Sequence, residues 1–156
     1  TNFGAFRGNT YTIEALANAA YNGRRRAFAE SELIAALQIL GRGDVPPSKM
    51  LGSVAGAMGH TQFMPTTYRR SGVDHTRDRR ANVWSDDPTD ALASAANYLR
   101  HLGWEKGQPW GVEVTLPRGF NYALIGEYET YTANFWNTRG VRTTGGGKIP
   151  NHGDGL

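Results

Sequence analysis

The stretch that decides the fold reads GSVAGAMGHTQFMPTTY and covers residues 52–68 of the chain. Its first half consists mostly of small residues, which let a backbone approach another surface closely, and glycine permits conformations that other residues avoid. Gln62 and Phe63 then follow in direct succession. One interpretation is a tight packing contact followed by a loop. The other is a backbone-lined floor that presents four side chains to a ligand: Ser53, Met58, Gln62 and Phe63.

The composition around this stretch is that of a globular chain with a modest positive charge. The 156 residues are 39% hydrophobic and 20% charged, and this length suits one domain with its own buried core. No apolar run approaches the roughly 18 residues that span a bilayer. Cysteine is absent, which excludes disulfides, thiolate metal sites and a cysteine nucleophile. The net charge of +3 fits an anionic polymer, whether nucleic acid, acidic glycan or membrane surface.

Hydrophobic spacing predicts two helices before the decisive stretch. The first begins with Thr10 or Thr12 as its cap and ends at Asn22. The second runs over residues 24–40, and its expected buried stripe is Ala29, Leu33, Ala36, Leu37 and Leu40. Three arginines at 24–26 crowd its first turn, where the helix dipole disfavours positive charge. Such breaks of a local rule are enriched at functional sites, although a solvated basic patch also explains them.

A third helix is predicted to start at Asp87, with Pro88 at its first position, and to end before Gly103. Its expected buried positions are Leu92, Ala95, Ala96, Leu99 and Leu102. Tyr98 lies beside this stripe, either as core-edge packing or as the wall of a groove.

Beyond this helix the character of the sequence changes. Residues 111–117 alternate between apolar and polar side chains and predict a strand. The glycine-rich segment 143–156 is expected to be poorly ordered, or to belong to a structure completed by residues outside this chain. We therefore expect a mainly α (α+β) chain with a helical core over residues 1–117 and a partly irregular extension over residues 118–156.

Metal and acid–base chemistry leave weak signals. Residues 74, 76, 78 and 82 occupy ligand positions of a twelve-residue calcium loop, but Arg79 replaces its glycine and Ser85 its bidentate acid. We expect a degenerate loop and assign neither metal ligands nor a cofactor. The histidines show no zinc-binding spacing. No general acid can be selected, because the helical acidic residues fit exposed positions: Glu14, Glu30, Glu32 and Asp90. The arginine clusters lack a recognition helix or aromatic platform, which disfavours nucleic acid.

Residues 52–68, with Val73-Asp74, Trp84, residues 87–90 and residues 96–98, closely resemble the lytic murein transglycosylase B family. The combined pattern is GAMG-x-x-QFMP-[ST]-[ST]-Y followed by V-D, W, D-P-x-D-A and A-N-Y-L, and the family's order extends from Asn2 to about Arg142. The resemblance implies a lysozyme-like helical domain with a small β appendage. It also implies cleavage of the β-1,4 bond between N-acetylmuramic acid and N-acetylglucosamine in peptidoglycan, leaving a 1,6-anhydro end.

The resemblance places the family's single acid–base glutamate immediately before Thr1, outside this sequence, and a later tyrosine-bearing segment beyond Leu156. Such a carboxyl must stay protonated in a partly apolar cleft, because the muramyl C6 hydroxyl acts as the nucleophile. The chain thus resembles a family member truncated at both ends. From this chain alone we expect little or no lytic activity, and we assign it no catalytic residue.

The substrate-binding residues carried over by resemblance are Ser53, Met58, Gln62, Phe63, Tyr98 and Arg25. Ser53 and Gln62 would hydrogen-bond to sugar and N-acetyl groups, while Met58 and Phe63 give apolar contact. Tyr98 offers a ring and a hydroxyl on the cleft wall, and Arg25 or a neighbour would meet the acidic peptide stem.

The implied partner is the peptidoglycan glycan strand, with no nucleic acid. The implied compartment is the periplasm of a Gram-negative bacterium. A lipid anchor outside this chain is one route to the outer membrane. An alternative from another class is a non-catalytic peptidoglycan-binding module that keeps the cleft without the acid.

Overall fold

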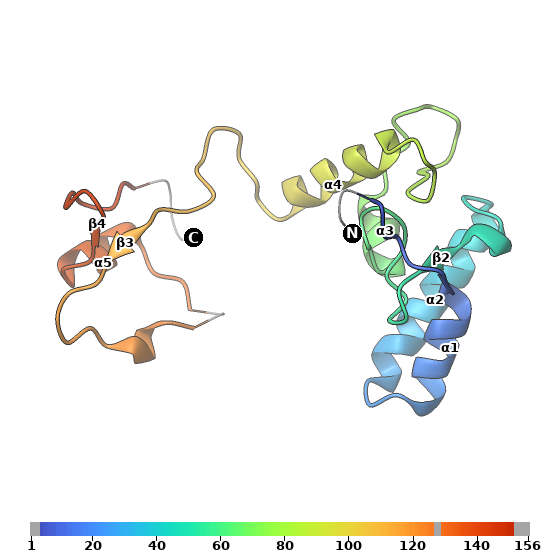
Figure 1. The fold of residues 1–156 in the computed structure, drawn as a ribbon, viewed down its shortest axis with the longest axis horizontal. Coiled ribbons are helices and arrows are strands. Elements are labelled where there is room, and N and C mark those ends of the chain that lie inside the picture. The colour runs from blue at the N-terminus through green and yellow to red at the C-terminus, as the bar shows by residue number, and fades with distance from the viewer. Residues whose placement is uncertain (1–3, 127–128, 152–156) are drawn as a thin grey trace. The chain divides into compact units, whose positions relative to one another are not determined.

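A computed structural model describes residues 4–126 and 129–151 of the chain. The chain forms two compact units, Thr1–Trp104 and Glu105–Leu156, and each is described by itself (Figure 1). The first unit therefore ends earlier than the boundary expected after residue 117. The reason is that strand β3 (Val114–Thr115) pairs with a later strand of the second unit rather than with the helical core.

Among its described residues, the first unit contains four α-helices and one short 3-10 helix. They are α1 (Thr12–Asn22), α2 (Arg26–Arg42), η1 (Pro47–Lys49), α3 (Pro65–Ser71) and α4 (Thr89–His101). Helices α1 and α2 lie side by side (Figure 1). Gly43 ends α2 in the left-handed conformation at φ 75°, and its N–H donates to the carbonyls of Ile39 and Leu40. Glycine adopts this conformation without the steric cost that a Cβ brings.

The decisive stretch folds against the chain that precedes α1. Strands β1 (Thr10–Tyr11) and β2 (Leu51–Gly52) pair antiparallel, with Thr10 opposite Gly52. Met58 then forms one antiparallel bridge with Gly52 and another with Phe63. The stretch therefore doubles back on itself beside β1 before Pro65 starts α3.

One core holds the first unit together, and residues 52–68 supply three of its members. The buried cluster is Leu16, Ala36, Ile39, Val45, Met50, Met58, Phe63, Tyr68, Val83 and Ala91. The Tyr68 ring packs against Trp84 with 5.3 Å between centroids, and its hydroxyl donates to the carbonyl of Ala81 at 2.7 Å. The interpretation as a tight packing contact is thus confirmed, while the presentation of side chains to a ligand stays a prediction.

The buried face of α2 differs from the expected stripe. Leu37 is 51% exposed, whereas Glu32 is only 3% exposed. The expectation of an exposed Glu32 was wrong because its carboxylate accepts hydrogen bonds from the N–H and the hydroxyl of Thr66, at 2.9 and 2.7 Å. These bonds satisfy the start of α3, and they set which face of α2 turns inward.

Helix α4 is also rotated relative to expectation. Leu92, Leu99 and Leu102 are exposed, whereas Asp90 and Ser94 are buried. The inward face is polar because it receives the preceding loop: the Ser94 hydroxyl accepts the N–H of Val73 at 2.9 Å, and Asp90 accepts several further N–H groups of that loop.

Helix α4 begins one residue later than predicted, at Thr89, with Pro88 as its N-cap in place of Asp87. The Asp87 carboxylate accepts the N–H of Thr89 at 3.0 Å and its hydroxyl at 2.6 Å. The hydrogen bonds from the Thr89 hydroxyl and N–H hold the pKa of the Asp87 carboxyl below its usual range.

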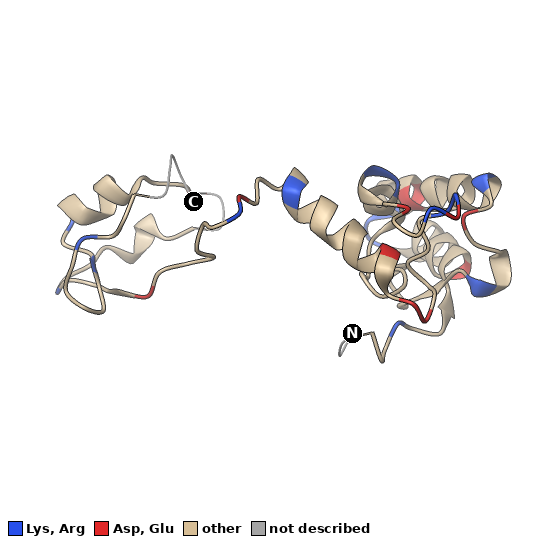
Figure 2. Cartoon of the chain, turned by 90° about the horizontal axis from the view of Figure 1, so that it is seen from above, with Lys and Arg blue, Asp and Glu red and all other residues tan. Residues whose placement is uncertain are grey.

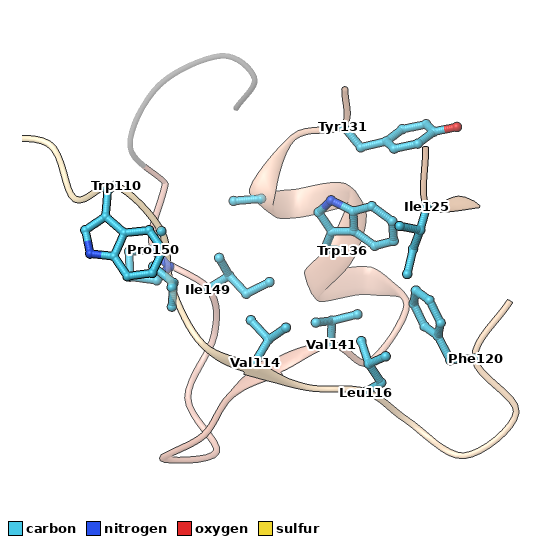
Figure 3. Close-up of a pocket in the computed structure, with 13 residues that line it drawn as sticks. Trp110, Val114, Leu116, Phe120, Ile125, Tyr131, Trp136, Val141, Ile149 and Pro150 are labelled. Carbon is cyan, nitrogen blue, oxygen red and sulfur yellow. The ribbon is translucent and has the colours of Figure 1, made fainter. Parts of the chain in front are cut away.

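The second unit contains β3, η2 (Tyr122–Leu124), α5 (Ala133–Thr138) and β4 (Arg142–Thr143). Only Val114 and Thr115 of the predicted strand at 111–117 pair in the ladder, opposite Thr143 and Arg142. The apolar side chains of Val114, Leu116, Val141 and Trp136 gather around one space of about 370 Å³ (Figure 3).

The expected disorder of the C-terminal segment was wrong for residues 143–151. Asn137 donates to the carbonyl of Ile149 at 3.0 Å and accepts its N–H at 2.8 Å, which fixes this part of the chain on α5. Residues 152–156 lie outside the described residues. Within the part of the chain that the structure describes, no helix is both long and apolar enough to cross a membrane.

Candidate functional site

Ser53 opens the loop between β2 and α3 and shapes it through its hydroxyl. Its Oγ accepts the N–H groups of Ala55 and Ala57 at 3.3 and 3.2 Å. Gly56 follows at φ 86°, where an added Cβ would lie 2.5 Å from Cδ2 of Leu16. The loop therefore sits directly on α1, at a distance that only glycine allows. The partly exposed Ser53 hydroxyl is held by this turn.

Gln62 has a backbone conformation that is unusual for its residue type. Its φ is 52°, in the left-handed region, which costs free energy in a residue with a Cβ. Its Nε2 donates to the carbonyls of Gly59 at 2.8 Å and Arg7 at 3.1 Å. Because both partners are carbonyl acceptors, the amide orientation is fixed. Gln62 thus ties the segment before β1 to the loop.

Phe63 and Tyr98 bring together two elements that are distant in sequence. Their ring centroids lie 5.3 Å apart at 54°, a geometry typical of favourable aromatic pairs. Phe63 is 7% exposed and Tyr98 is half-buried, so the pair lies at the boundary between core and surface. Met58 is 0% exposed. Its side chain lies beneath this surface, and we assign it a supporting position in place of the direct contact expected.

Arg25 does not join the other candidate residues. It is exposed at the residue before α2, and its guanidinium stacks on the Phe28 ring at 4.4 Å from the centroid. Among the described residues, no hydrogen bond, ion pair or ring contact links Arg25 to the loop at 53–63. The structure therefore places the Phe63 ring on Tyr98 and bridges Phe63 to buried Met58, with Ser53 and Gln62 in the same loop, and leaves Arg25 apart.

Arg7 is a residue that the sequence analysis did not single out. Its Nη1 donates to the carbonyls of Trp84 and Ser85, both at 2.9 Å, and its Nη2 pairs with Asp86 at 2.6 Å. Figure 2 shows how basic positions (blue) and acidic positions (red) are distributed along the chain. Hydrogen bonding and charge from Arg7 hold the pKa of the Asp86 carboxyl below its usual range. The available signal was a lone arginine between glycines, which does not identify a partner 77 residues away.

His60 completes the same junction. Its Nε2 lies 2.7 Å from the carbonyl of Ser85, so this nitrogen carries the proton and donates. An added Cβ on Gly4 would lie 2.1 Å from Nδ1 of His60, and Gly4 has φ 85°. The segment at 4–8 is thus packed against His60 and fastened by Arg7 and Gln62.

Asp90 organises the loop that resembles a calcium site. It is 2% exposed and accepts the N–H groups of His75 and Thr76 at 2.9 Å and of Asn82 at 3.0 Å. Burial raises the pKa of Asp90, but these hydrogen bonds outweigh burial and the pKa lies below its usual range. The expectation of an exposed Asp90 was therefore wrong.

The loop over residues 74–85 keeps part of the ligand set of a calcium site. Carboxylate oxygens of Asp74, Asp78 and Asp90 lie within 4.8 Å of one another, so the loop retains a set of hard oxygen donors. Both oxygens of Asp74 already accept N–H groups, from Asp78 and Arg79, and the Ser85 hydroxyl accepts the N–H of Asp87. The bidentate acid of a calcium loop is thus missing at its usual place, which Ser85 occupies.

Comparisons with known proteins identify the family and the fold of this chain. The model of the transglycosylase SLT domain family matches residues 1–155. The chain is 38% identical over 126 residues to the membrane-bound lytic murein transglycosylase B of Escherichia coli, which is 77% of this chain and 34% of that protein.

Two solved structures have similar folds. SltB3 from Pseudomonas aeruginosa in complex with NAG-NAM-pentapeptide has a TM-score of 0.88 and 49% identity, over 99% of this chain and 41% of that one. The Escherichia coli lytic transglycosylase Slt35 in complex with calcium has a TM-score of 0.82 and 31% identity, over 99% and 47%.

These matches confirm the expected mainly helical, lysozyme-like fold class with small β elements. The chain spans about a third to a half of the length of these relatives, at 34%, 41% and 47%. Because the family model covers the chain almost from end to end, this protein belongs to the transglycosylase SLT domain family.

Proposed function

We propose that this chain is the glycan-binding part of a peptidoglycan lytic transglycosylase. In this proposal the surface of Ser53, Gln62, Phe63 and Tyr98 binds a murein strand, and the protein at its natural length cleaves the N-acetylmuramic acid–N-acetylglucosamine β-1,4 bond with formation of a 1,6-anhydro end. The observation that carries the proposal is the Phe63–Tyr98 ring pair beside Gln62 in a chain that matches the family over residues 1–155.

In this proposal, residues of this chain bind the sugars, and one carboxyl transfers the proton. An aromatic pair offers apolar surface to the faces of sugar rings, and the Ser53 and Tyr98 hydroxyls offer hydrogen bonds to hydroxyl and N-acetyl groups. A glutamate before Thr1 would protonate the glycosidic oxygen and then accept the proton of the C6 hydroxyl as that oxygen attacks C1. The residues of this chain would orient the strand so that this attack is in reach.

The setting of the reaction follows from the substrate. Peptidoglycan surrounds bacterial cells, and one relative is described as membrane-bound. We propose the periplasm of a Gram-negative bacterium as the compartment. A lipid anchor would hold the protein at the outer membrane. SltB3 was solved with NAG-NAM-pentapeptide, which supports a murein strand with its peptide as the partner of this chain.

The test measures release of anhydro-muropeptides by the protein at its natural length. Tyr98→Phe removes one hydroxyl but keeps the ring on Phe63, and should lower kcat/KM about tenfold through lost substrate positioning. Gln62→Ala should lower it further, by about a hundredfold, because the loop loses its tie to Arg7. The control is Gln38→Ala, which replaces an exposed glutamine on α2.

The results separate three interpretations. Unchanged turnover in Tyr98→Phe and Gln62→Ala, with the fold intact by circular dichroism, would contradict the assigned surface. Binding of murein without any release of anhydro ends would instead favour the non-catalytic module. Binding that both variants weaken, together with release by the unsubstituted protein, would support the proposal.

A further inference from the structure

A closed ring of hydrogen bonds joins three segments of the first unit that are distant in sequence. They are residues 4–8, the turn at residues 59–62, and residues 83–85 before α4. Gln62 lies in the turn with φ 52°. A non-glycine backbone in this region persists only where the surrounding contacts hold it, and such positions are enriched at functional sites. The contacts of the ring are therefore what keeps Gln62 in place.

Three consecutive carbonyls before α4 form the fixed side of this ring. The carbonyl of Val83 accepts the backbone N–H of His60 at 2.9 Å, and the carbonyl of Ser85 accepts Nε2 of His60 at 2.7 Å. The carbonyls of Trp84 and Ser85 both accept Nη1 of Arg7. The turn and the side chain of Arg7 are thus fastened to the same short segment.

The main chain of Arg7 completes the ring. Its carbonyl accepts Nε2 of Gln62 at 3.1 Å, and the carbonyl of Gly59 accepts the same nitrogen at 2.8 Å. Gly8 follows at φ 84°, where an added Cβ would lie 2.0 Å from the backbone oxygen of Gly52. The Arg7 carbonyl is therefore held by the guanidinium on one side and by this close backbone approach on the other.

These contacts decide which atom of the Gln62 amide is left for a ligand. The amide nitrogen carries two N–H donors, and both are used by carbonyls. No group among the described residues donates a hydrogen bond to Oε1. The buried side-chain oxygens without a partner in that part of the chain are the hydroxyls of Thr12 and Thr61. Since Gln62 is partly exposed, its Oε1 lies at the surface as a free acceptor.

We propose that Arg7 is a positioning residue, which holds the Gln62 amide so that its oxygen accepts a hydrogen bond from the sugar. The inference rests on the proposed function, which supplies a ligand with hydroxyl and N-acetyl N–H donors. Without the guanidinium the carbonyl of Arg7 is no longer fixed, and the amide is free to turn its nitrogen outward. That nitrogen would meet the donors of the ligand with donors of its own. Arg7 touches no ligand and acts through Gln62.

The experiment is a double-mutant cycle on the protein at its natural length. Calorimetry measures its affinity for the NAG-NAM disaccharide, which lacks the bond that the proposed reaction cleaves. Arg7→Gln alone should weaken binding about fivefold, which corresponds to one displaced hydrogen bond. In the Gln62→Ala background the same substitution should have no further effect, because the group through which Arg7 acts is gone.

Two further variants separate positioning from loss of charge or of stability. Arg7→Lys keeps the charge but not the planar fork that reaches two carbonyls, so it should weaken binding only about twofold. Arg42→Gln removes an arginine that also pairs with an aspartate, Asp44. Among the described residues no hydrogen bond or ion pair joins Arg42 to the turn at 59–62, so this variant should bind like the unsubstituted protein. Binding is measured well below the unfolding midpoint of each variant.

Coupled losses in the cycle, with partial recovery in Arg7→Lys, would support the positioning role. Additive losses, or full affinity in Arg7→Gln, would overturn this role and leave the proposed function in place. A loss in Arg42→Gln as large as in Arg7→Gln would also overturn it, because the effect would then reflect charge alone. Failure of the unsubstituted protein to bind the disaccharide would overturn the proposed function, and the positioning role with it.

Discussion

Two loops of the first unit, residues 53–64 and residues 73–88, are both irregular and polar, yet they are held by opposite means. The later loop is fastened by one buried side chain, since Asp90 accepts N–H groups from three of its residues. The earlier loop is fastened by its own backbone, which bridges Gly52, Met58 and Phe63. In the earlier loop, glycines without a Cβ allow the backbone to lie directly against neighbouring atoms, as at Gly56 and Gly59.

The difference predicts how each loop fails. A loop that depends on one carboxylate loses several hydrogen bonds at once when this group is removed. A loop that depends on close backbone approach does not tolerate an added Cβ at the glycines that make this approach. Loss of the Asp90 carboxylate should therefore damage residues 73–88, and an added Cβ at a packed glycine should damage residues 53–64.

Asp90→Ala should have the largest effect and lower the free energy of unfolding by about 4 kcal/mol, because three partly buried N–H donors lose a charged acceptor. Chemical denaturation monitored by circular dichroism measures this. Asp78→Ala is the matched control in the same loop, since Asp78 is exposed and accepts one N–H, from Arg80 at 2.9 Å. The control should cost at most about 1 kcal/mol. Equal losses would show that the loop does not depend on Asp90.

Gly59→Ala should cost about 2.5 kcal/mol, by the opposite mechanism. Gly59 has φ 59°, and an added Cβ would lie 2.2 Å from the backbone oxygen of Val83. Gly103→Ala provides the control, because Gly103 has φ 89° and no atom within 4 Å of the added Cβ. It should cost only the conformational strain of about 1 kcal/mol. If both substitutions cost the same in thermal unfolding, close approach contributes nothing at Gly59.

Acid should weaken the later loop before the earlier one. The pKa of Asp90 is lowered in the folded chain, so the unfolded chain binds a proton more readily, and stability falls as pH drops below about 4 towards the folded pKa. Above the unfolded pKa this contribution is fully present. Urea unfolding between pH 2 and 6 should therefore give a stability gap between the unsubstituted chain and Asp90→Asn that narrows at low pH. A constant gap would rule out titration of Asp90 in this range.

The sequence predicts the helix ends better than their orientation. The end of α1 at Asn22 and the glycine stop after α2 follow from local signals, whereas the predicted caps of α1 and α4 were wrong, since Tyr11 and Pro88 occupy those positions. The inward face of α4 could not be predicted from hydropathy, because it is chosen by hydrogen bonds to a loop that precedes the helix. Apolar Leu92 and Leu99 were expected inside and are exposed, since Asp90 and Ser94 occupy the inner face.

For the candidate site, too, some residues could be predicted from the sequence and others could not. The grouping of Gln62, Phe63 and Tyr98 was predicted through motif resemblance, and the structure does bring Phe63 and Tyr98 together. Arg7 and Glu32 were missed because their partners lie 77 and 34 residues away, and no local pattern encodes such pairings. The substrate-binding roles of Gln62, Phe63 and Tyr98 stay predictions, which turnover and binding measurements would test.

The smallest effect is expected at the junction of Arg7 with the loop before α4. Asp86→Asn removes the charge of a side chain that is 97% exposed, and solvent screens such a pair, so the midpoint of unfolding should stay almost unchanged. Arg7→Gln also removes the donors to the carbonyls of Trp84 and Ser85, and should cost about 1.5 kcal/mol. The two variants thus separate charge from hydrogen bonding at one side chain. A loss in Asp86→Asn as large as in Arg7→Gln would mean that the ion pair itself fastens the segment, and added salt should then destabilise the unsubstituted chain to the same extent.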